Sequence, residues 1–322
     1  MLPGQQVLER QFIFIVGAAR SGTTWLHNMI ADHPQVAALR GVELTVFPRY
    51  LSIPVSQYRA ERADMLAGRW RLGLGAIWDE ERFARHVRDL IADAYGDVLA
   101  TRPEATHILD KHPNSSRYMD LIAEWLPSAR FVHVIRDGRE VAVSAMSVNK
   151  RVGHSAGEIG QAARDWNEFT RKAMIAGRRL GDRYLEVRYD RLRSGGANAL
   201  REVFAHCGLP VTDEQLGTVV ASNDISRRQY SSGDATLNAL RDKPEGIWRS
   251  RLGPIDRYRF DRWAGALLVE LGYARPGWWA GGPVQRSLVA SYALLHRLLR
   301  SLRAIATTWK RTATDPFQPD QA

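Results

Sequence analysis

A short loop near the N-terminus combines one cation, three hydroxyl groups and a glycine. These residues are Arg20, Ser21, Gly22, Thr23 and Thr24. The apolar run before the loop, residues 12–16, is typical of a buried strand, and apolar residues at helical spacing follow from Trp25 onward. Where a strand, a glycine loop and a helix N-terminus meet, backbone N–H groups point towards a bound anion and the helix dipole stabilises it. These residues therefore predict a phosphate-binding loop.

The spacing of Gly17 and Gly22 matches that of a Walker A loop, but one residue of that motif is missing. The motif requires a lysine directly after the second glycine, and this chain has Thr23 there. The cation is Arg20 instead, two positions before the glycine. The loop can hold a phosphate-like group but lacks the lysine that supports ATP and GTP chemistry. The alternative is a simple turn with Arg20 in solvent.

A second segment carries the chemistry of an anion site. Residues 130–135 form another apolar run that predicts a buried strand, and Arg136 follows it directly. Ser144 lies eight residues further on, inside the helix that the pattern predicts next. A guanidinium fork and a hydroxyl group suit a phosphate monoester. The alternative is an ordinary strand–helix unit with a surface arginine.

Polar residues also follow the predicted strand at residues 106–109. Asp110, Lys111 and His112 come next in the chain. Ligands of open parallel sheets bind beyond the carboxyl ends of the strands, and a lysine there can stabilise negative charge on a leaving group. A surface ion pair between Asp110 and Lys111 is the alternative interpretation.

The loop from Arg20 to Trp25 resembles the 5′-phosphosulfate loop of sulfotransferases that use 3′-phosphoadenosine 5′-phosphosulfate (PAPS). Arginine at position 20 is similar to the carbohydrate, tyrosylprotein and bacterial members, whereas cytosolic members have lysine. The segment from Arg136 to Ser144 resembles the part of these enzymes that binds the 3′-phosphate, and these two residues match the ligands. Tyr189 opens a Tyr-Asp-Arg-Leu stretch similar to one whose tyrosine contacts the adenosine.

The resemblance also implies catalytic roles. Glu43 matches the general base of tyrosylprotein sulfotransferases if two residues are inserted before it, and a glutamate in a partly apolar pocket gains basicity. The alternative is a loop carboxylate in water. Lys111 matches the lysine that acts on the oxygen between phosphorus and sulfur. His112 is a second candidate base, because cytosolic members use a histidine near this place, although their Lys-x-His spacing is not kept.

The resemblance implies one α/β domain over residues 1–282, with the fold of the P-loop nucleoside triphosphate hydrolases and a central parallel sheet flanked by helices. Strands are predicted at 12–16, 35–39, 106–109, 130–135 and 184–189. The pattern predicts helix over most of residues 50–100 and over residues 161–181. The polar stretch 222–246 is expected to be a lid whose Arg227, Arg228, Arg241 and Lys243 close over phosphates.

Residues 283–322 are predicted to form an amphipathic basic helix and a disordered tail. Leu288, Tyr292, Leu295, Leu299, Leu302 and Ala306 share one face of the helix. The helix can pack on the body, meet a partner helix, or lie through residues 284–311 on an anionic membrane.

The charge and composition of the chain indicate which kinds of ligand it suits. The net charge is +10, and only five of the 45 basic residues are lysine. Arginine favours bidentate binding of phosphate and sulfate groups.

The one cysteine, Cys207, is expected in the core, and a reducing compartment fits best. We therefore expect a cytoplasmic protein, with peripheral membrane contact through residues 284–311 as a further expectation. No apolar run of signal-peptide or membrane-span length occurs in the sequence.

Together the residues and the resemblance predict a transferase. It moves the sulfuryl group of PAPS to a hydroxyl or amine of a glycan, lipid, peptide or small molecule, releases adenosine 3′,5′-bisphosphate (PAP), and uses no metal. One alternative is a nucleotide-dependent kinase with Asp110 holding Mg²⁺. The other is a basic nucleic-acid-binding protein, although no base-reading motif is present and no specific nucleic acid is expected. The acceptor and the oligomeric state cannot be deduced from the sequence.

Overall fold

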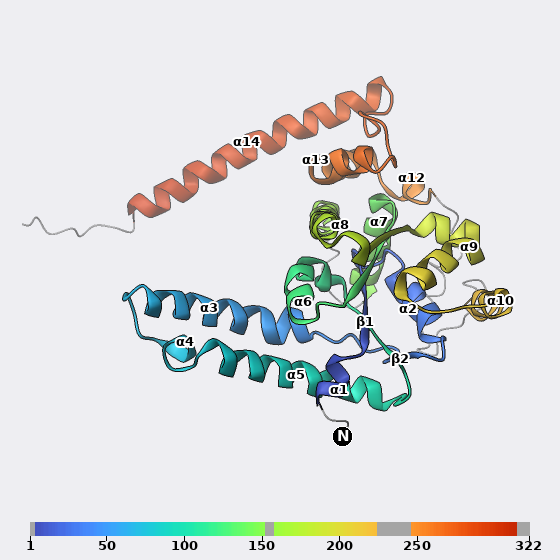
Figure 1. Ribbon diagram of the computed structural model, residues 1–322. Helices are drawn as coiled ribbons and strands as arrows, with labels where there is room; N and C mark the ends of the chain where they lie inside the picture. The colour runs from blue at the N-terminus through green and yellow to red at the C-terminus, as the bar shows by residue number, and fades with distance from the viewer. Residues whose placement is uncertain (1–3, 152–157, 224–245, 314–322) are drawn as a thin grey trace, which may run out of the picture.

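The computed structural model describes residues 4–151, 158–223 and 246–313 of the chain (Figure 1). Its centre is a five-stranded sheet in the order β2-β3-β1-β4-β5, with every neighbouring pair parallel. The strands are β1 (Gln11–Val16), β2 (Val36–Ala38), β3 (His107–Lys111), β4 (Arg130–Ile135) and β5 (Tyr184–Arg188). All five lie where the sequence predicts strands, and the α/β class is confirmed.

Helices occupy most of the remaining described chain. They are α1 (Gly4–Leu8), α2 (Thr23–Ala31), α3 (Ser52–Leu66), α4 (Gly73–Ile77), α5 (Glu80–Ala100), α6 (Met119–Trp125), α7 (Gly138–Arg151), α8 (Ile159–Leu180), α9 (Tyr189–Cys207), α10 (Asp213–Ser222), α12 (Trp248–Arg251), α13 (Pro254–Glu270) and α14 (Pro283–Ala313). Three short helical turns, η1 (Val46–Leu51), η2 (Pro113–Arg117) and η3 (Gly181–Arg183), complete the described elements. No described helix is both long enough and apolar enough to span a bilayer.

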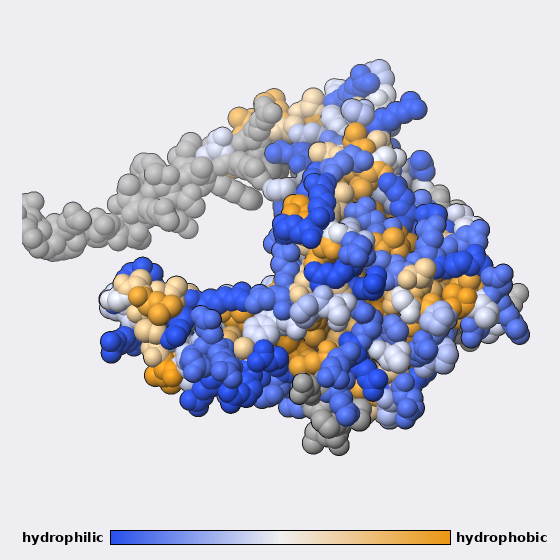
Figure 2. Space-filling model, in the orientation of Figure 1, coloured by the Kyte–Doolittle hydropathy of each residue, from blue (hydrophilic) through white to orange (hydrophobic). Residues whose placement is uncertain are grey.

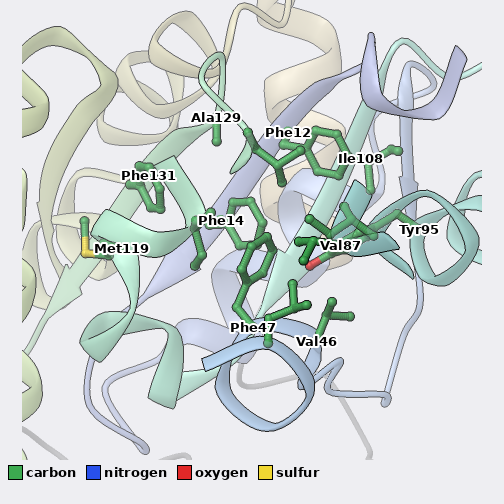
Figure 3. Close-up of a cluster of buried hydrophobic side chains, with 14 of the residues drawn as sticks. Phe12, Phe14, Val46, Phe47, Val87, Tyr95, Ile108, Met119, Ala129 and Phe131 are labelled. Carbon is green, nitrogen blue, oxygen red and sulfur yellow. The ribbon is translucent and has the colours of Figure 1, made fainter. Parts of the chain in front are cut away.

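The central strand β1 is apolar from Phe12 to Val16, because this part of it is buried on both faces. Phe12 and Phe14 point to one face, where Phe47, Tyr95 and Phe131 join them (Figure 3). The rings of Phe14 and Phe131 stack with centroids 5.7 Å apart, and Tyr95 meets Phe12 edge-on at 5.1 Å. This aromatic cluster fixes α5 and η1 against the sheet.

The opposite face of the sheet is covered by α2, α9 and α10. Ile13 and Ile15 of β1 pack there with residues of α2 and α9, including Leu26 and Phe204. Cys207 ends α9 inside this cluster, where burial raises the pKa of its thiol to about 12. Cys207 is therefore the core residue that the sequence predicts.

Parallel pairing places the carboxyl ends of the strands at one edge. The register aligns Ile15 of β1 with Lys111 of β3, and Val16 with His133 of β4. Asp110 and Lys111 are the last two residues of β3, not a cluster after it. The loop after β1, the end of β3 and the residues after β4 therefore share this edge.

Three other expectations concern the ends and the long loop. The lid candidates Arg227, Arg228, Arg241 and Lys243, and the tail after residue 313, lie outside the described residues. The division of the chain at residue 282 stays a prediction. Helix α14 begins at Pro283 beside α13 and extends well beyond it (Figure 1).

Candidate active site

The loop between β1 and α2 has a backbone that depends on its glycines. Gly17 has φ +140° and Gly22 has φ +101°. A Cβ atom on Gly22 would lie 2.4 Å from the ring of Tyr189, and one on Gly17 would lie 2.6 Å from the carbonyl oxygen of Val134. The N–H of Gly17 donates to the Ser116 hydroxyl at 2.9 Å. Close packing therefore fixes the turn that the spacing of the two glycines predicts.

The hydroxyl of Ser21 shows that this loop is built for a ligand. Its side chain is buried, and Oγ has no hydrogen-bond partner among the residues that the structure describes. Buried hydroxyl groups in native proteins are almost always hydrogen-bonded. Thr23 and Thr24 begin α2 two residues after Ser21, so this hydroxyl belongs to the turn that leads into the positive end of the helix dipole. A phosphate or sulfate oxygen satisfies both.

The two predicted anion-binding segments lie together. Arg20 donates from Nε to Oγ of Ser144 at 3.2 Å, and Arg136 donates from Nη1 to the carbonyl oxygen of Arg20 at 3.4 Å. Arg20 itself has a left-handed backbone, with φ +74°. Arg20 thus forms one basic cluster with Arg136 and Ser144, which lie more than a hundred residues further along the sequence.

Tyr189 connects this cluster to the loop. It is the first residue of α9, directly after β5, and is not a residue closing the edge of the sheet. The guanidinium carbon of Arg136 lies 4.2 Å from the centroid of its ring, and the indole of Trp25 meets the ring edge-on at 5.6 Å. The predicted residues Trp25 and Arg136 therefore both contact the ring of Tyr189.

The predicted catalytic residues form a second group. Lys111 donates from Nζ to the carboxylate of Glu43 in an ion pair, and His112 Nε2 lies 3.6 Å from the other carboxylate oxygen. The Lys111 side chain is 8% exposed and that of Glu43 is 44% exposed. Glu43 is therefore not in the partly apolar pocket that the sequence led us to expect, because it lies in an irregular segment on the solvent side of Lys111.

The histidines near this group are neutral at pH 7. Burial lowers the pKa of His112 more than the neighbouring Glu43 carboxylate raises it. Burial, together with the charge of Lys111, lowers the pKa of His27 to about 4. His112 stays a second candidate base, but its Nδ1 accepts from the N–H of Asn114 at 3.1 Å, which leaves the ring proton on Nε2, the nitrogen that faces Glu43.

Asp110 has a different role from the one that a kinase requires. Its side chain is buried and accepts a hydrogen bond from the Tyr95 hydroxyl at 2.7 Å, inside the aromatic cluster. Burial raises the pKa of Asp110 to about 6. The surface ion pair with Lys111 is also absent, since Lys111 pairs with Glu43. Within the described ranges, no three acidic, histidine or cysteine side chains are placed to hold a metal ion.

Four residues that pack around these segments have no individual role in the sequence analysis. Ser116 holds Gly17, and Glu140 accepts from the N–H of Gly246 at 2.8 Å. Asn223 accepts from the Trp25 indole at 2.9 Å through its carbonyl oxygen. Arg139 packs its guanidinium 3.9 Å from the Trp248 ring centroid. No local pattern marks these residues, because each depends on a partner far away in sequence.

The fold and the site together define an α/β protein with an anion-binding loop between its central strand and the following helix. Residues 12–213 match the model of the sulfotransferase family. This match covers more than half of the chain, and the chain belongs to the sulfotransferase family.

Relatives and solved structures agree with this assignment. Protein-tyrosine sulfotransferase 1 of Danio rerio is 25% identical over 269 residues, which cover 81% of this chain and 72% of that protein. The protein-tyrosine sulfotransferase of Drosophila melanogaster is 27% identical over 211 residues, or 65% of this chain and 40% of the other. The sulfotransferase domain of the Synechococcus PCC 7002 olefin synthase has the same fold, with a TM-score of 0.50, 23% identity, and coverage of 80% of this chain and 94% of that one.

The chain is thus a PAPS-dependent sulfotransferase, and its residues fit this donor. PAPS supplies an activated sulfuryl group on a phosphate leaving group and carries a second phosphate on its ribose. The unpartnered Ser21 hydroxyl and the helix N-terminus suit one anionic end, and the arginines next to them suit a second.

Proposed function

We propose that Glu43 is the general base of sulfuryl transfer and that Lys111 stabilises the leaving phosphate. One observation carries this proposal: both side chains meet at the carboxyl end of β3, at the same sheet edge as the phosphate-binding loop. A carboxylate next to solvent can accept the proton of an incoming hydroxyl, and a nearly buried ammonium acts strongly on developing negative charge.

The donor-binding roles follow from the basic cluster. We assign Arg20, Ser21 and the N–H groups of residues 22–24 to the phosphosulfate end of PAPS. We assign Arg136 and Ser144 to the 3′-phosphate, and Trp25 and Tyr189 to the adenosine. The contacts of Arg20 with Ser144 and with Arg136 support this division, because two anion sites must be close to serve one nucleotide.

The acceptor is proposed to be a hydroxyl group. The two relatives described above are named protein-tyrosine sulfotransferases, so a tyrosine-containing peptide is the first acceptor to test, before glycans, lipids and small phenols.

The location of the protein is also a proposal. We propose that it works in the cytoplasm, at a membrane surface. The single cysteine, which is buried and free, is compatible with a reducing compartment.

Calorimetric titration with PAP and with adenosine 5′-phosphosulfate, which lacks the 3′-phosphate, tests the donor assignment. Losing a charged hydrogen bond to phosphate weakens binding by roughly 10- to 100-fold. Arg136→Ala should therefore weaken PAP binding by this factor and leave adenosine 5′-phosphosulfate binding nearly unchanged, whereas Arg20→Ala should weaken both.

The matched control is Arg201→Ala, which removes a surface arginine paired with Asp213. It should bind both nucleotides as the parent does. Equal losses for the two nucleotides in Arg136→Ala would contradict the assignment of the 3′-phosphate.

A further inference from the structure

Helix α14 presents apolar side chains that nothing in the described structure covers. Leu288, Leu294, Leu295, Leu298 and Leu299 are between 47% and 62% exposed, and Val284 is 83% exposed. Figure 2 shows apolar surface where α14 leaves the body. Monomeric soluble proteins rarely expose contiguous apolar patches of this kind unless the patch binds something.

The first turns of α14 are anchored on the body by a different side of the helix. Val289 is 3% exposed and lies one turn before Ala293, which faces α13. The exposed leucines occupy other positions of the helical wheel. Packing on α13 therefore fixes the helix and leaves its leucines facing outwards.

The charge of α14 indicates which partner the leucines meet. Between residues 283 and 313 the sequence contains six basic residues and no acidic residue. A second copy of α14 would carry the same positive charge and repel the first. An amphipathic helix with basic residues and exposed leucines suits a lipid surface with negative headgroups.

A small hollow at the base of α14 adds an independent observation. It has a volume of about 110 Å³ between α8, α13 and α14. Its walls include Arg164, Arg259, Arg262, Tyr258, Trp263 and Tyr292, with Glu158 as the one acidic residue. The hollow is several times larger than the space that one water molecule needs, so a phosphate-sized group fits.

The side chains of the hollow suit an anion next to a membrane. Arg259 is paired with Glu158 at 2.6 Å, and Arg164 lies over the Trp263 ring at 4.5 Å. Arg262 is exposed and makes no ion pair with any described residue, so the hollow keeps excess positive charge. Trp263 is 46% exposed, and tryptophan and tyrosine are enriched where proteins meet lipid headgroups.

We propose that α14 and the hollow at its base form a docking surface for an anionic lipid bilayer. The leucines enter the boundary between headgroups and acyl chains, and the hollow binds the phosphate of one lipid headgroup. This surface is separate from the donor site, and the inference does not depend on the catalytic roles proposed above.

Co-sedimentation of the full chain with vesicles tests the inference. Vesicles of phosphatidylcholine alone are compared with vesicles that also contain phosphatidylglycerol, at low and high salt. The protein should bind the anionic vesicles, and the binding should weaken with salt.

Three variants separate the contributions. Leu294→Glu combined with Leu298→Glu should lower the partition coefficient by about tenfold or more. Arg262→Glu reverses a charge in the hollow and should lower the partition coefficient by roughly twentyfold. Leu90→Glu is the matched control, since Leu90 is 41% exposed on α5, and it should bind as the parent does. All variants should keep the PAP affinity of the parent, which shows that they are folded.

Four results would overturn the inference. The first is equal binding to neutral and anionic vesicles, and the second is no binding to either. The third is binding of inorganic phosphate, measured by calorimetry, without any vesicle binding, which would make the hollow a site for a soluble anion. The fourth is a dimer in sedimentation equilibrium that the double leucine variant abolishes, again without vesicle binding.

Discussion

The ammonium group of Lys111 and the carboxylate of Glu43 form an ion pair at the carboxyl end of β3. The pair joins a nearly buried cation to a carboxylate that faces solvent. In the proposed reaction these groups have different partners, because Lys111 acts on the leaving phosphate and Glu43 acts on the acceptor hydroxyl. Donor binding therefore competes for Lys111, and this competition releases Glu43 to act as a base.

Glu43→Gln should lower kcat by about 10²- to 10⁴-fold, which is the usual contribution of a general base. The affinity for PAP should stay the same or increase, because Lys111 no longer has a carboxylate partner. Transfer of labelled sulfate to a hydroxyl acceptor measures kcat, and calorimetry measures PAP binding.

Glu124→Gln is the control for this variant, since Glu124 is 45% exposed and also paired with a basic residue, Arg59. It should leave kcat unchanged. If Glu43→Gln keeps full turnover and His112→Ala loses it, the base is His112.

Gly22→Ala should damage the phosphate-binding loop. The new methyl group would lie 2.4 Å from the Tyr189 ring on a backbone with φ +101°. Strain of this kind costs about 1–3 kcal/mol, and PAP affinity should fall as the loop moves. Gly68→Ala also has a positive φ, +69°, but nothing lies within 4 Å of its Cβ, so only strain of about 1 kcal/mol is expected. Denaturant unfolding should show a larger loss of stability for Gly22→Ala than for Gly68→Ala, and PAP titration should show weaker binding for Gly22→Ala alone. Equal PAP affinities of the two variants would contradict the packing argument.

Asp110 should make stability depend on pH. Its folded pKa is raised from 3.8 to about 6, so the folded chain holds this proton more tightly than the unfolded chain. The stabilisation that this proton gives to the folded chain is complete below pH 3.8 and is lost as pH rises through about 6. Asp110→Asn cannot ionise and its amide oxygen can still accept from Tyr95. The free energy of unfolding of Asp110→Asn, taken relative to that of the parent, should therefore rise by up to about 3 kcal/mol between pH 4 and pH 7.

Urea unfolding at several pH values measures this difference. The control is Asp97→Asn on the exposed side of α5, which should show a much smaller change with pH. A constant difference between Asp110→Asn and the parent would show that Asp110 does not hold its proton in the folded state.

Arg139→Met should destabilise the fold. Arg139 is buried, pairs with Asp137 at 2.6 Å, donates to the carbonyl oxygen of Tyr273, and packs against the rings of both Trp248 and Trp278. Removing one partner of a buried ion pair typically costs about 3–5 kcal/mol. Arg82→Met is the control, because Arg82 stacks on Trp78 while exposed, and it should cost less than about 1 kcal/mol. Thermal unfolding compares them, and similar losses would show that burial of Arg139 matters little.

The parts of the site that the sequence could predict are those with local signals. Gly17, Arg20 and Ser21 follow a fully apolar strand, and strand, turn and helix start lie within about twenty residues. The second anion segment was recognisable for the same reason. Because the carboxyl ends of parallel strands share one edge of the sheet, the sequence also predicts that Arg20 and Arg136 lie close together.

The parts that could not be predicted depend on distant packing. Asp110 and Lys111 are adjacent, but alternate residues of a strand face opposite sides, so one meets Tyr95 and the other Glu43. The exposure of Glu43 depends on where an irregular segment crosses the sheet edge. The bond from Gly17 to Ser116 joins residues 99 positions apart and has no counterpart in either local sequence.

The ring of Tyr189 also has a consequence for donor selectivity. It packs against Gly22 in one anion-binding segment and against Arg136 in the other. The ring therefore contacts both of the proposed anion-binding segments, which are also joined by the hydrogen bond from Arg136 to Arg20. Under the proposed donor assignment, a smaller residue at position 189 would loosen the packing between these segments without removing any cation, so selectivity between nucleotides would depend on this contact as well as on charge.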